Sequence, residues 1–404
     1  MMRSSRLTSE VGDDLADPPN SGPSSVRLSE FHRSPGHKRR TAAHIKGDRV
    51  GDRGNNNPPQ SSTMPAISTG KVLVSGANGY VAAWVVRTLL EAGFSVRGAV
   101  RSEEKGAHLK KMFTSYGDKF ELAVVPDIMK EGAFDEAVKG VDAIEHTASP
   151  FHFHSDDPAD YLGPAINGTT GILRSALKFA PTVKRVVVTS SAAAVVGNHF
   201  TQAVTTLSET DWNDDSVKLV EEKGREAPNG DKYRASKTLA ERAAWTFVNE
   251  HKSAISWDLV CLNPPLVLGP TIHELTSPDA LNTSMHLMYT AFRTPDFTGG
   301  IPLWVDVRDL ATAHVRSLTT PEAGGERFIV SRGAYKWQDF LDGIPASKKS
   351  PSGPYITGTP GSGKNATFPI LLDASKSERV LGMRYRGVDE TARDVVADWE
   401  ARGW

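Results

Sequence analysis

Two hydrophobic patterns alternate along most of this chain. Short runs of β-branched and other apolar residues are followed by longer segments in which apolar positions recur about every three to four residues. The short runs are typical of strands that are buried on both faces, and the longer segments are typical of helices that cover a sheet. Their alternation predicts an α/β fold built on a doubly wound parallel sheet.

The pattern assigns a place to each predicted element. Strands are expected at residues 72–74, 94–100, 120–125, 143–150, 185–189, 256–263 and 327–330. Helices are expected at residues 85–90, 105–116, 133–138, 161–179, 233–251, 278–292, 307–318 and 388–400. Elements in the last third of the chain are less regular and are separated by longer loops.

The first 65 residues show neither pattern. They are rich in Pro, Gly, Ser, Asn and charged residues, so they cannot bury enough apolar surface to offset the entropy lost on ordering. We therefore expect a disordered N-terminal extension at 1–65 and a cofactor-binding core with the catalytic residues at 66–265. We expect the remaining core elements, interleaved with a smaller substrate-binding lobe, at 266–404.

The first predicted strand ends in a turn of small residues. Gly76 allows a tight turn, Gly79 lets the backbone approach a pyrophosphate, and Ala82 lets the next helix lie close to the sheet. The N-terminus of that helix offers unpaired N–H groups to phosphates. An ordinary tight connection would use the same small residues, but the strand and helix on either side favour a dinucleotide-binding Rossmann fold.

The second strand ends in a basic residue. NAD sites usually carry an Asp or Glu here to accept from the ribose 2′-hydroxyl, whereas this chain has Arg101, with Lys105 close behind. Basic side chains suit a 2′-phosphate, which a guanidinium binds through two donors. The alternative is a solvated loop of mixed charge, because Glu103 and Glu104 lie between the two. We expect NADPH/NADP as the cofactor.

A candidate catalytic group follows the fifth strand. Tyr233 and Lys237 are four residues apart, so they share one face of the predicted helix. A nearby ammonium and a nicotinamide cation favour the phenolate and so lower the pKa of a tyrosine. Ser190 and Ser191 stand at the carboxyl end of the strand, where active groups of open α/β sheets gather. A surface tyrosine beside a lysine would show the same spacing.

These motifs together resemble the extended short-chain dehydrogenase/reductases. Within that family the chain is most similar to the fungal NADPH-dependent aldehyde/ketone reductases of the methylglyoxal-reductase and dihydroflavonol-4-reductase-like branch. The resemblance begins at Met64 and reaches the C-terminus. It is carried by the segments Val74–Tyr80, Arg101–Lys105, Pro126–Ile128, His146–Pro150, Thr189–Ser191, Tyr233–Lys237, Asn263–Pro265 and Val305–Ala311.

The resemblance implies a role for each site residue. Ser191 matches the catalytic serine, Tyr233 the acid, and Lys237 the residue that lowers the pKa of the acid and holds the nicotinamide ribose. Cofactor-binding positions are Gly76, Asn78, Gly79, Tyr80, Val81, Arg101, Lys105, Asp127, Ile128, Thr147, Ala148, Ser149, Tyr233, Lys237 and Pro264. Pocket-wall positions for the substrate are Phe151, Phe153 and Val196, although core packing is the ordinary role of such residues. Asn167 matches a helix asparagine with either an active-site or a structural role, and Val305–Ala311 matches a structural element behind the site.

The resemblance also implies the reaction. We expect an NADP-dependent oxidoreductase that reduces an aldehyde or ketone carbonyl to an alcohol. The alternatives are a nucleotide-sugar epimerase or dehydratase and a non-catalytic NADP-sensing regulator. The segment Trp337–Pro354 departs from the family pattern, because Gly343 and Pro345 stand where a longer helix is expected. This puts the shape of the smaller lobe, and hence the size of the substrate, in question.

The composition of the chain limits the kinds of binding partner that we expect. A net charge of −1 and a pI near 6.9 argue against nucleic-acid and membrane partners. The single cysteine, Cys261, excludes an internal disulfide and is typical of a reducing compartment, so we expect a cytoplasmic protein. The histidines lack metal-ligand spacing, and we expect no metal. The expected partners are a small carbonyl substrate and, for a homodimer rather than a monomer, a second copy.

One motif is misleading. The segment Gly358–Lys364 imitates a phosphate-binding P-loop, but Asn365 stands where that motif has a magnesium-binding Ser or Thr. Pro360 lies inside the segment, and no predicted strand leads into it. We interpret it as a loop of the smaller lobe rather than a nucleotide site.

We predict that the extension is dispensable. Met64 stands directly before the first strand and is a candidate translation start. A chain that begins at Met64 should equal the full chain in melting temperature and turnover, because the extension offers no apolar face for docking. A melting temperature lower by several degrees, measured by calorimetry, would show that the extension packs on the core.

Overall fold

The computed structural model describes residues 66–149, 155–197, 204–349 and 354–404. Contacts divide the chain into residues 1–37 and 38–404, and all described residues belong to the second unit. The expected disordered extension at 1–65 lies outside the described residues. The expected division at residue 265 into core and lobe stays a prediction.

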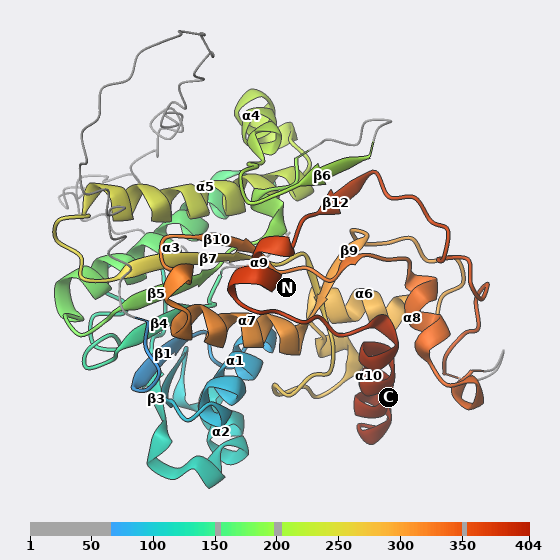
Figure 1. The fold of residues 1–404 in the computed structure, drawn as a ribbon, viewed down its shortest axis with the longest axis horizontal. Helices are drawn as coiled ribbons and strands as arrows, with labels where there is room; N and C mark the ends of the chain where they lie inside the picture. Colours follow the sequence, from blue (N-terminus) through green and yellow to red (C-terminus); the bar gives the residue numbers. More distant parts are fainter. Residues whose placement is uncertain (1–65, 150–154, 198–203, 350–353) are drawn as a thin grey trace, which may run out of the picture. The chain divides into compact units, whose positions relative to one another are not determined.

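A seven-stranded parallel sheet forms the centre of the fold (Figure 1). Its strands lie in the order β10-β7-β5-β4-β1-β2-β3. The strands are β1 (Lys71–Ser75), β2 (Ser95–Val100), β3 (Phe120–Val124), β4 (Ala143–His146), β5 (Arg185–Thr189), β7 (Asp258–Asn263) and β10 (Arg327–Ile329). The chain reverses its direction of travel across the sheet between β1 and β4, which is where open α/β sheets bind ligands. The predicted doubly wound sheet is confirmed.

The central strands of the sheet are buried on both faces because most of their positions are apolar. Val72 and Val74 of β1 pack against one layer, whereas Leu73 packs against the other. The first layer consists of α1 (Tyr80–Glu91), α2 (Glu103–Met112) and α7 (Val307–Thr319), and the second consists of α3 (Ala159–Phe179) and α5 (Asn229–Glu250). Figure 1 shows the two layers on opposite sides of the sheet.

Smaller elements complete the fold. A three-stranded sheet contains β8 (Leu266–Leu268), β9 (Leu303–Asp306) and β11 (Gly333–Ala334), and a two-stranded sheet pairs β6 (Thr205–Leu207) with β12 (Ile370–Leu372). The other helices are α4 (Asp214–Lys223), α6 (Thr283–Ala291), α8 (Trp337–Gly343), α9 (Ser375–Val380) and α10 (Val388–Ala401). Short 3-10 turns lie at Thr114–Lys119, Ala192–Ala194, Gly224–Glu226, Pro278–Ala280, Pro321–Ala323 and Ala346–Lys348. Among the described residues, no helix is both long and apolar enough to cross a bilayer.

The predicted helix at 133–138 is wrong. The segment is a series of turns, in which the N–H groups of Asp135 and Lys139 donate to the carbonyls of Gly132 and Glu136, three residues back instead of four. Its apolar residues are still buried, since Phe134 and Val138 pack under the sheet. The spacing of apolar residues therefore predicted which side chains are buried, but it did not predict the backbone conformation.

An aromatic cluster forms a separate core beside the small sheets. Trp304 of β9, Phe340 of α8 and Trp399 of α10 are almost fully buried in it. Two side chains of α1 connect this region to the large sheet. The hydroxyl of Tyr80 donates to the Gly269 carbonyl and the indole of Trp84 donates to the Pro270 carbonyl, each at 2.9 Å.

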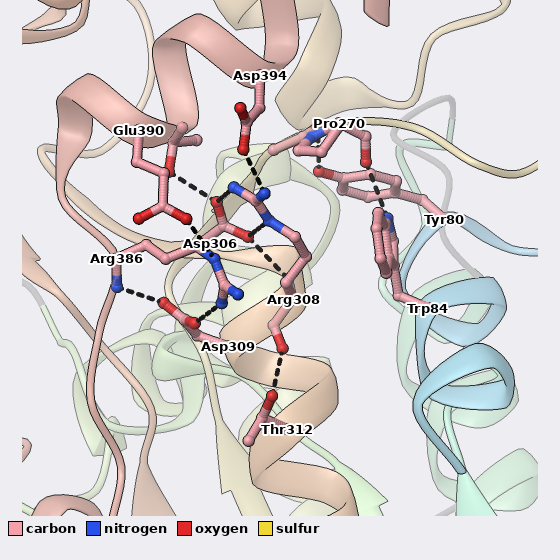
Figure 2. A network of polar contacts seen from close by, with 12 residues as sticks. Tyr80, Trp84, Pro270, Asp306, Arg308, Asp309, Thr312, Arg386, Glu390 and Asp394 are labelled. Carbon is pink, nitrogen blue, oxygen red and sulfur yellow. Dashed lines mark hydrogen bonds and ion pairs between the residues drawn. The ribbon is translucent and has the colours of Figure 1, made fainter. Parts of the chain in front are cut away.

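A network of charged side chains lies next to these contacts (Figure 2). Asp306 is fully buried and caps α7 by accepting from the backbone N–H of Arg308 at 2.8 Å. Its carboxylate also accepts from the guanidinium of Arg308 and, at 2.6 Å, from the hydroxyl of Thr391 on α10. The guanidinium of Arg308 also forms an ion pair with Asp394, which lies on the same helix as Thr391. Asp306 and Arg308 thus connect the start of α7 to α10, and the structural role expected for Val305–Ala311 stays a prediction.

We predict that removing one donor from Asp306 destabilises the fold. Thr391→Val should lower the free energy of unfolding by about 1.5 to 3 kcal/mol, because the lost hydrogen bond serves a buried charge. Thr312→Val is the matched control, since the hydroxyl of Thr312 bonds only to the Arg308 carbonyl of its own helix. Urea denaturation measures both. Equal losses in the two variants would contradict the assigned role of Asp306.

Candidate active site

The glycine turn forms a cradle that has room only for backbone. Gly76 has a φ of +64°, and a Cβ placed on it would lie 3.1 Å from the Cβ of Ala148. Gly79 precedes α1, and a Cβ there would lie 3.2 Å from the Gly76 carbonyl oxygen. No side chain caps the N-terminus of α1, and no acidic residue occupies its first turn. The residues present therefore fit a pyrophosphate at this helix end.

Other predicted cofactor positions surround this turn. Asn78 is half-buried in it. Tyr80 and Val81 begin α1, and both side chains pack into the aromatic cluster. The hydroxyl of Tyr80 is occupied by Gly269, so this side chain supports the turn from behind. Only the backbone of Tyr80 is then available for the predicted cofactor contact.

The predicted 2′-phosphate position is open. Arg101 and Lys105 are both exposed, and neither side chain bonds to another described residue. Ser102 caps α2 by accepting from the backbone N–H of Lys105. This cap orients the start of α2 directly behind Arg101. Within the described residues this leaves two unpaired cationic side chains at the end of β2, which suits a 2′-phosphate.

The adenine positions lie at the end of the next strand. Asp127 is exposed and accepts from the backbone N–H of Met129 at 2.9 Å. Ile128 is half-buried and packs against the core under the sheet. The two residues sit in a turn beyond β3. That strand neighbours β2 in the sheet, so the turn lies on the same side of the glycine cradle as Arg101.

Ser75 holds the segment that runs beside the glycine turn. Its hydroxyl oxygen accepts from the backbone N–H groups of Thr147 and Ala148 at 3.1 and 3.0 Å. The hydroxyl of Thr147 donates in return to the Ser75 carbonyl. The next residue, Ser149, accepts from the ammonium of Lys237 at 2.6 Å. The predicted positions 147–149 thus connect the cofactor cradle to the catalytic lysine.

The structure brings the three predicted catalytic residues together. Ser191 starts the 3-10 turn after β5, and its side chain hydrogen-bonds that of Tyr233. The ammonium of Lys237 lies 5.7 Å from the centre of the Tyr233 ring, one turn along α5. The preceding Ser190 is directed elsewhere, since its hydroxyl donates to Glu241 at 2.5 Å. Ser191, rather than Ser190, is therefore the serine placed for chemistry.

Burial governs the ionisation of this group. It raises the pKa of Tyr233, and the hydrogen bond from Ser191 acts in the opposite direction. The expected lowering of that pKa by Lys237 is thus not the dominant effect here. Burial also lowers the pKa of Lys237 to about 8. At neutral pH the phenol is protonated and the lysine is charged, which is the state that a proton donor with a cationic neighbour needs.

A buried ionic cluster, which the sequence reasoning missed, supports the serine turn. Glu241 accepts from Ser190, from Asn263 at 2.7 Å and from Arg327 at 2.6 Å. The amide of Asn263 also reaches the Ser191 carbonyl at 3.1 Å. One signal was present, because Glu241 follows Tyr233 and Lys237 at the same four-residue spacing. Nothing in the sequence indicated that Arg327 would pair with it.

The expected substrate positions are partly described. Phe151 and Phe153 lie outside the described residues. Val196 is half-buried and packs against a small cluster that includes Leu303 of β9. Pro264 is buried, and its carbonyl accepts from the Ala192 backbone N–H at 2.9 Å, which fixes the turn that carries Ser191. Asn167 is exposed on α3, and its role stays a prediction.

Two other expectations concern other kinds of site. The P-loop-like segment Gly358–Lys364 is a turn with no strand leading into it, in agreement with its interpretation as a loop. No group of three His, Cys, Asp or Glu side chains within the described ranges is arranged to hold a metal ion.

The family is shown by comparison with known proteins. Residues 72–331 match the model of the NAD dependent epimerase/dehydratase family. This chain therefore belongs to that family, and the resemblance to extended short-chain dehydrogenase/reductases is confirmed.

Individual relatives are reductases. A ketoreductase of Aspergillus niger is 39% identical over 342 residues, which cover 81% of this chain and 96% of that protein. The NADPH-dependent methylglyoxal reductase of Saccharomyces cerevisiae is 36% identical over 81% of this chain and 97% of its own length. The crystal structure of yeast methylglyoxal/isovaleraldehyde reductase complexed with NADPH matches with a TM-score of 0.71 and 35% identity, covering 82% of this chain and 99% of the yeast chain.

We predict that Arg101 sets the preference for NADPH. Arg101→Ala should weaken NADPH binding by about ten- to a hundredfold, since charge-assisted hydrogen bonds to the 2′-phosphate are lost. NADH binding should be almost unchanged. Lys111→Ala is the matched control, because Lys111 is an exposed lysine at the far end of α2. Fluorescence titration measures the binding of both cofactors to both variants, and equal losses for NADPH and NADH would contradict this role.

We also predict a fall in activity at high pH. Lys237 is charged below its pKa of about 8 and loses its charge above it, so kcat/KM for the carbonyl substrate should decline as pH rises through that value. Lys237→Arg should move the decline to higher pH, because a guanidinium stays protonated. A flat profile for the unchanged enzyme across this range would show that the charge of Lys237 is not required.

Proposed function

We propose that this protein reduces the carbonyl group of an aldehyde or ketone to an alcohol with NADPH. One observation carries the proposal: Ser191, Tyr233 and Lys237 meet beside a cradle that fits a dinucleotide. The yeast methylglyoxal reductase is NADPH-dependent by name, and the yeast crystal structure holds NADPH. The chain is an NADP-dependent oxidoreductase acting on carbonyl and CH–OH groups.

Each residue has a definite task in this reaction. NADPH supplies the hydride when it is bound. Ser191 donates a hydrogen bond toward the substrate carbonyl oxygen, which orients the carbonyl for attack. The protonated phenol of Tyr233 delivers the proton to the nascent alkoxide. Lys237 stabilises the phenolate that remains and holds the nicotinamide ribose.

The alternatives fit less well. A non-catalytic NADP-sensing regulator has no need for Tyr233 and Lys237 at this spacing, and both are intact. An epimerase or dehydratase for nucleotide sugars needs basic and polar groups for a diphosphate in the smaller lobe. The apolar positions Phe151 and Phe153 instead favour a smaller and more apolar substrate.

We propose a small or moderately apolar substrate. The apolar positions Phe151, Phe153 and Val196 support this size and character. The short helix α8, which ends at Gly343, accords with a lobe that departs from the family pattern. A panel of short aldehydes, diketones and dihydroflavonols, followed by loss of NADPH absorbance, identifies the preferred class.

Location and assembly complete the proposal. The one cysteine, Cys261, is buried and unpaired, which suits a reducing compartment such as the cytoplasm. We propose a monomer or homodimer that acts on a free small molecule, without nucleic acid or membrane. Gel filtration with light scattering distinguishes the two assembly states.

We predict that Tyr233→Phe abolishes most of the activity. Turnover should fall by about two to four orders of magnitude, because the ring still packs but the proposed proton donor is lost. NADPH binding, measured by calorimetry, should survive. Ser191→Ala should lower turnover with little effect on the cofactor, whereas Lys237→Met should weaken both. Retention of most carbonyl reduction by Tyr233→Phe would refute the proposed function.

A further inference from the structure

A small cavity lies directly behind Lys237. Its volume is about 20 Å³, and it is bounded by β4, β5, α3 and α5. The polar side chains that line it are those of His146, Ser149, Thr169, Thr189, Ser190, Lys237 and Glu241. A cavity of about 10 to 15 Å³ is enough for one water molecule, provided that two to four polar partners surround it. The cavity thus has the size for one water and no more.

His146 lines this cavity and has one ring nitrogen without a hydrogen-bond partner among the described residues. The side chain is 2% exposed, and its Nε2 has no partner among the described residues. Ser75 determines which nitrogen carries the proton. The Ser75 oxygen already accepts from two backbone N–H groups, so its own hydrogen is left for Nδ1 of His146, 2.9 Å away. Nδ1 is therefore the acceptor, and Nε2 carries the hydrogen.

Lys237 supplies a second donor on the same cavity wall. One hydrogen of its ammonium is used by Ser149, which leaves others for further acceptors. Burial lowers the pKa of His146 to about 4, and the positive charge of Lys237 adds to this effect, so the imidazole is neutral beside the ammonium. Two donors cannot satisfy each other, whereas an acceptor between them would satisfy both.

The other polar groups on the cavity wall are mostly engaged. The hydroxyl of Thr189 pairs with His314 at 3.0 Å. The hydroxyl of Ser190 donates to Glu241, whose carboxylate also accepts from Asn263 and Arg327. The protein itself therefore offers little to the free hydrogens of His146 and Lys237.

We propose that one water molecule occupies this cavity and accepts hydrogen bonds from both His146 Nε2 and Lys237 Nζ. The hydroxyl of Thr169, which lines the cavity, offers an acceptor for the water's own hydrogens. A halide ion is disfavoured because the carboxylate of Glu241 lines the same cavity. His146 is then a positioning residue that acts on Lys237 through the water.

The effect of this water on catalysis rests on the proposed function, in which Lys237 acts as a cation. Lys237 must keep its charge while largely removed from water, and the bound water is an acceptor that stabilises this charge. The titratable groups around Lys237 are His146 on β4 and Tyr233 and Glu241 on α5. The residues of α3 and β5 that line the cavity carry only hydroxyl or aliphatic side chains. The water adds one acceptor for this charge to the hydroxyl of Ser149.

A crystal structure of the full chain with NADP tests the site without reference to activity. At high resolution it should show one ordered water within hydrogen-bond distance of both His146 Nε2 and Lys237 Nζ. An empty cavity, a halide, or a water that contacts neither group would overturn the inference. Because this readout is independent of turnover, it separates a failure of the inference from a failure of the proposed function.

A cavity-filling variant tests the effect on Lys237. Ala240 lines the cavity from α5, and Ala240→Val should displace the water while leaving every polar group in place. The high-pH decline of kcat/KM should then move to lower pH by about one unit or more, because the ammonium loses an acceptor.

Ala243→Val is the matched control for this variant. Ala243 is a buried alanine of the same helix that does not line the cavity, so its replacement should lower the melting temperature without moving the pH profile. Equal shifts in both variants, or no shift in Ala240→Val, would overturn the role given to the water. The crystal structure decides the question if Ala240→Val does not fold.

Discussion

The active site depends on keeping one positive charge inside the protein. Lys237 is largely removed from water, and its pKa falls to about 8 as a result. A charge in such a place is stable only if polar groups replace the solvent. Ser149 is one of these groups, and it stands at the end of the segment that Ser75 holds against the glycine cradle. The same contacts that stabilise the charge therefore fix the position of α5 relative to the cofactor site.

Burial also explains why Tyr233 can act as the acid in carbonyl reduction. The phenol of Tyr233 has a raised pKa, so it is protonated before the reaction. A bound nicotinamide would supply a second positive charge once oxidised, and that charge together with Lys237 would favour the phenolate. The acid thus becomes stronger at the moment when the alkoxide needs a proton. A tyrosine exposed to water would gain less from either charge, because solvent would screen them.

Much of this could be predicted from the sequence because it depends on local spacing. The glycine turn follows a strand and opens a helix, and Tyr233 and Lys237 are one helical turn apart. Long apolar runs such as β5 could also be assigned to the central sheet. Short strands such as β6 and β12 were missed, since three residues carry too little pattern and their pairing joins segments far apart in the sequence.

The residues that support the site were harder to find for the same reason. Glu241 and Arg327 meet only after α5 and β10 take their places in the fold. Asn167 was a candidate on sequence grounds, yet Thr169, two residues later, is the side chain that lines the cavity behind the lysine. A difference of two positions on a helix turns a side chain from one face to another. Such a difference cannot be inferred without the packing of α3 against α5.

The most direct test of this account is the ionisation of Tyr233 itself. Ultraviolet difference titration of the NADP-bound protein against Tyr233→Phe isolates the signal of this one tyrosine. We expect Tyr233 to ionise at a lower pH with NADP than without it. In Lys237→Met the ionisation should move back to higher pH, because one of the two stabilising charges is gone. If the ionisation of Tyr233 is the same with and without Lys237, the buried charge is not what makes this tyrosine an acid, and the central claim is wrong.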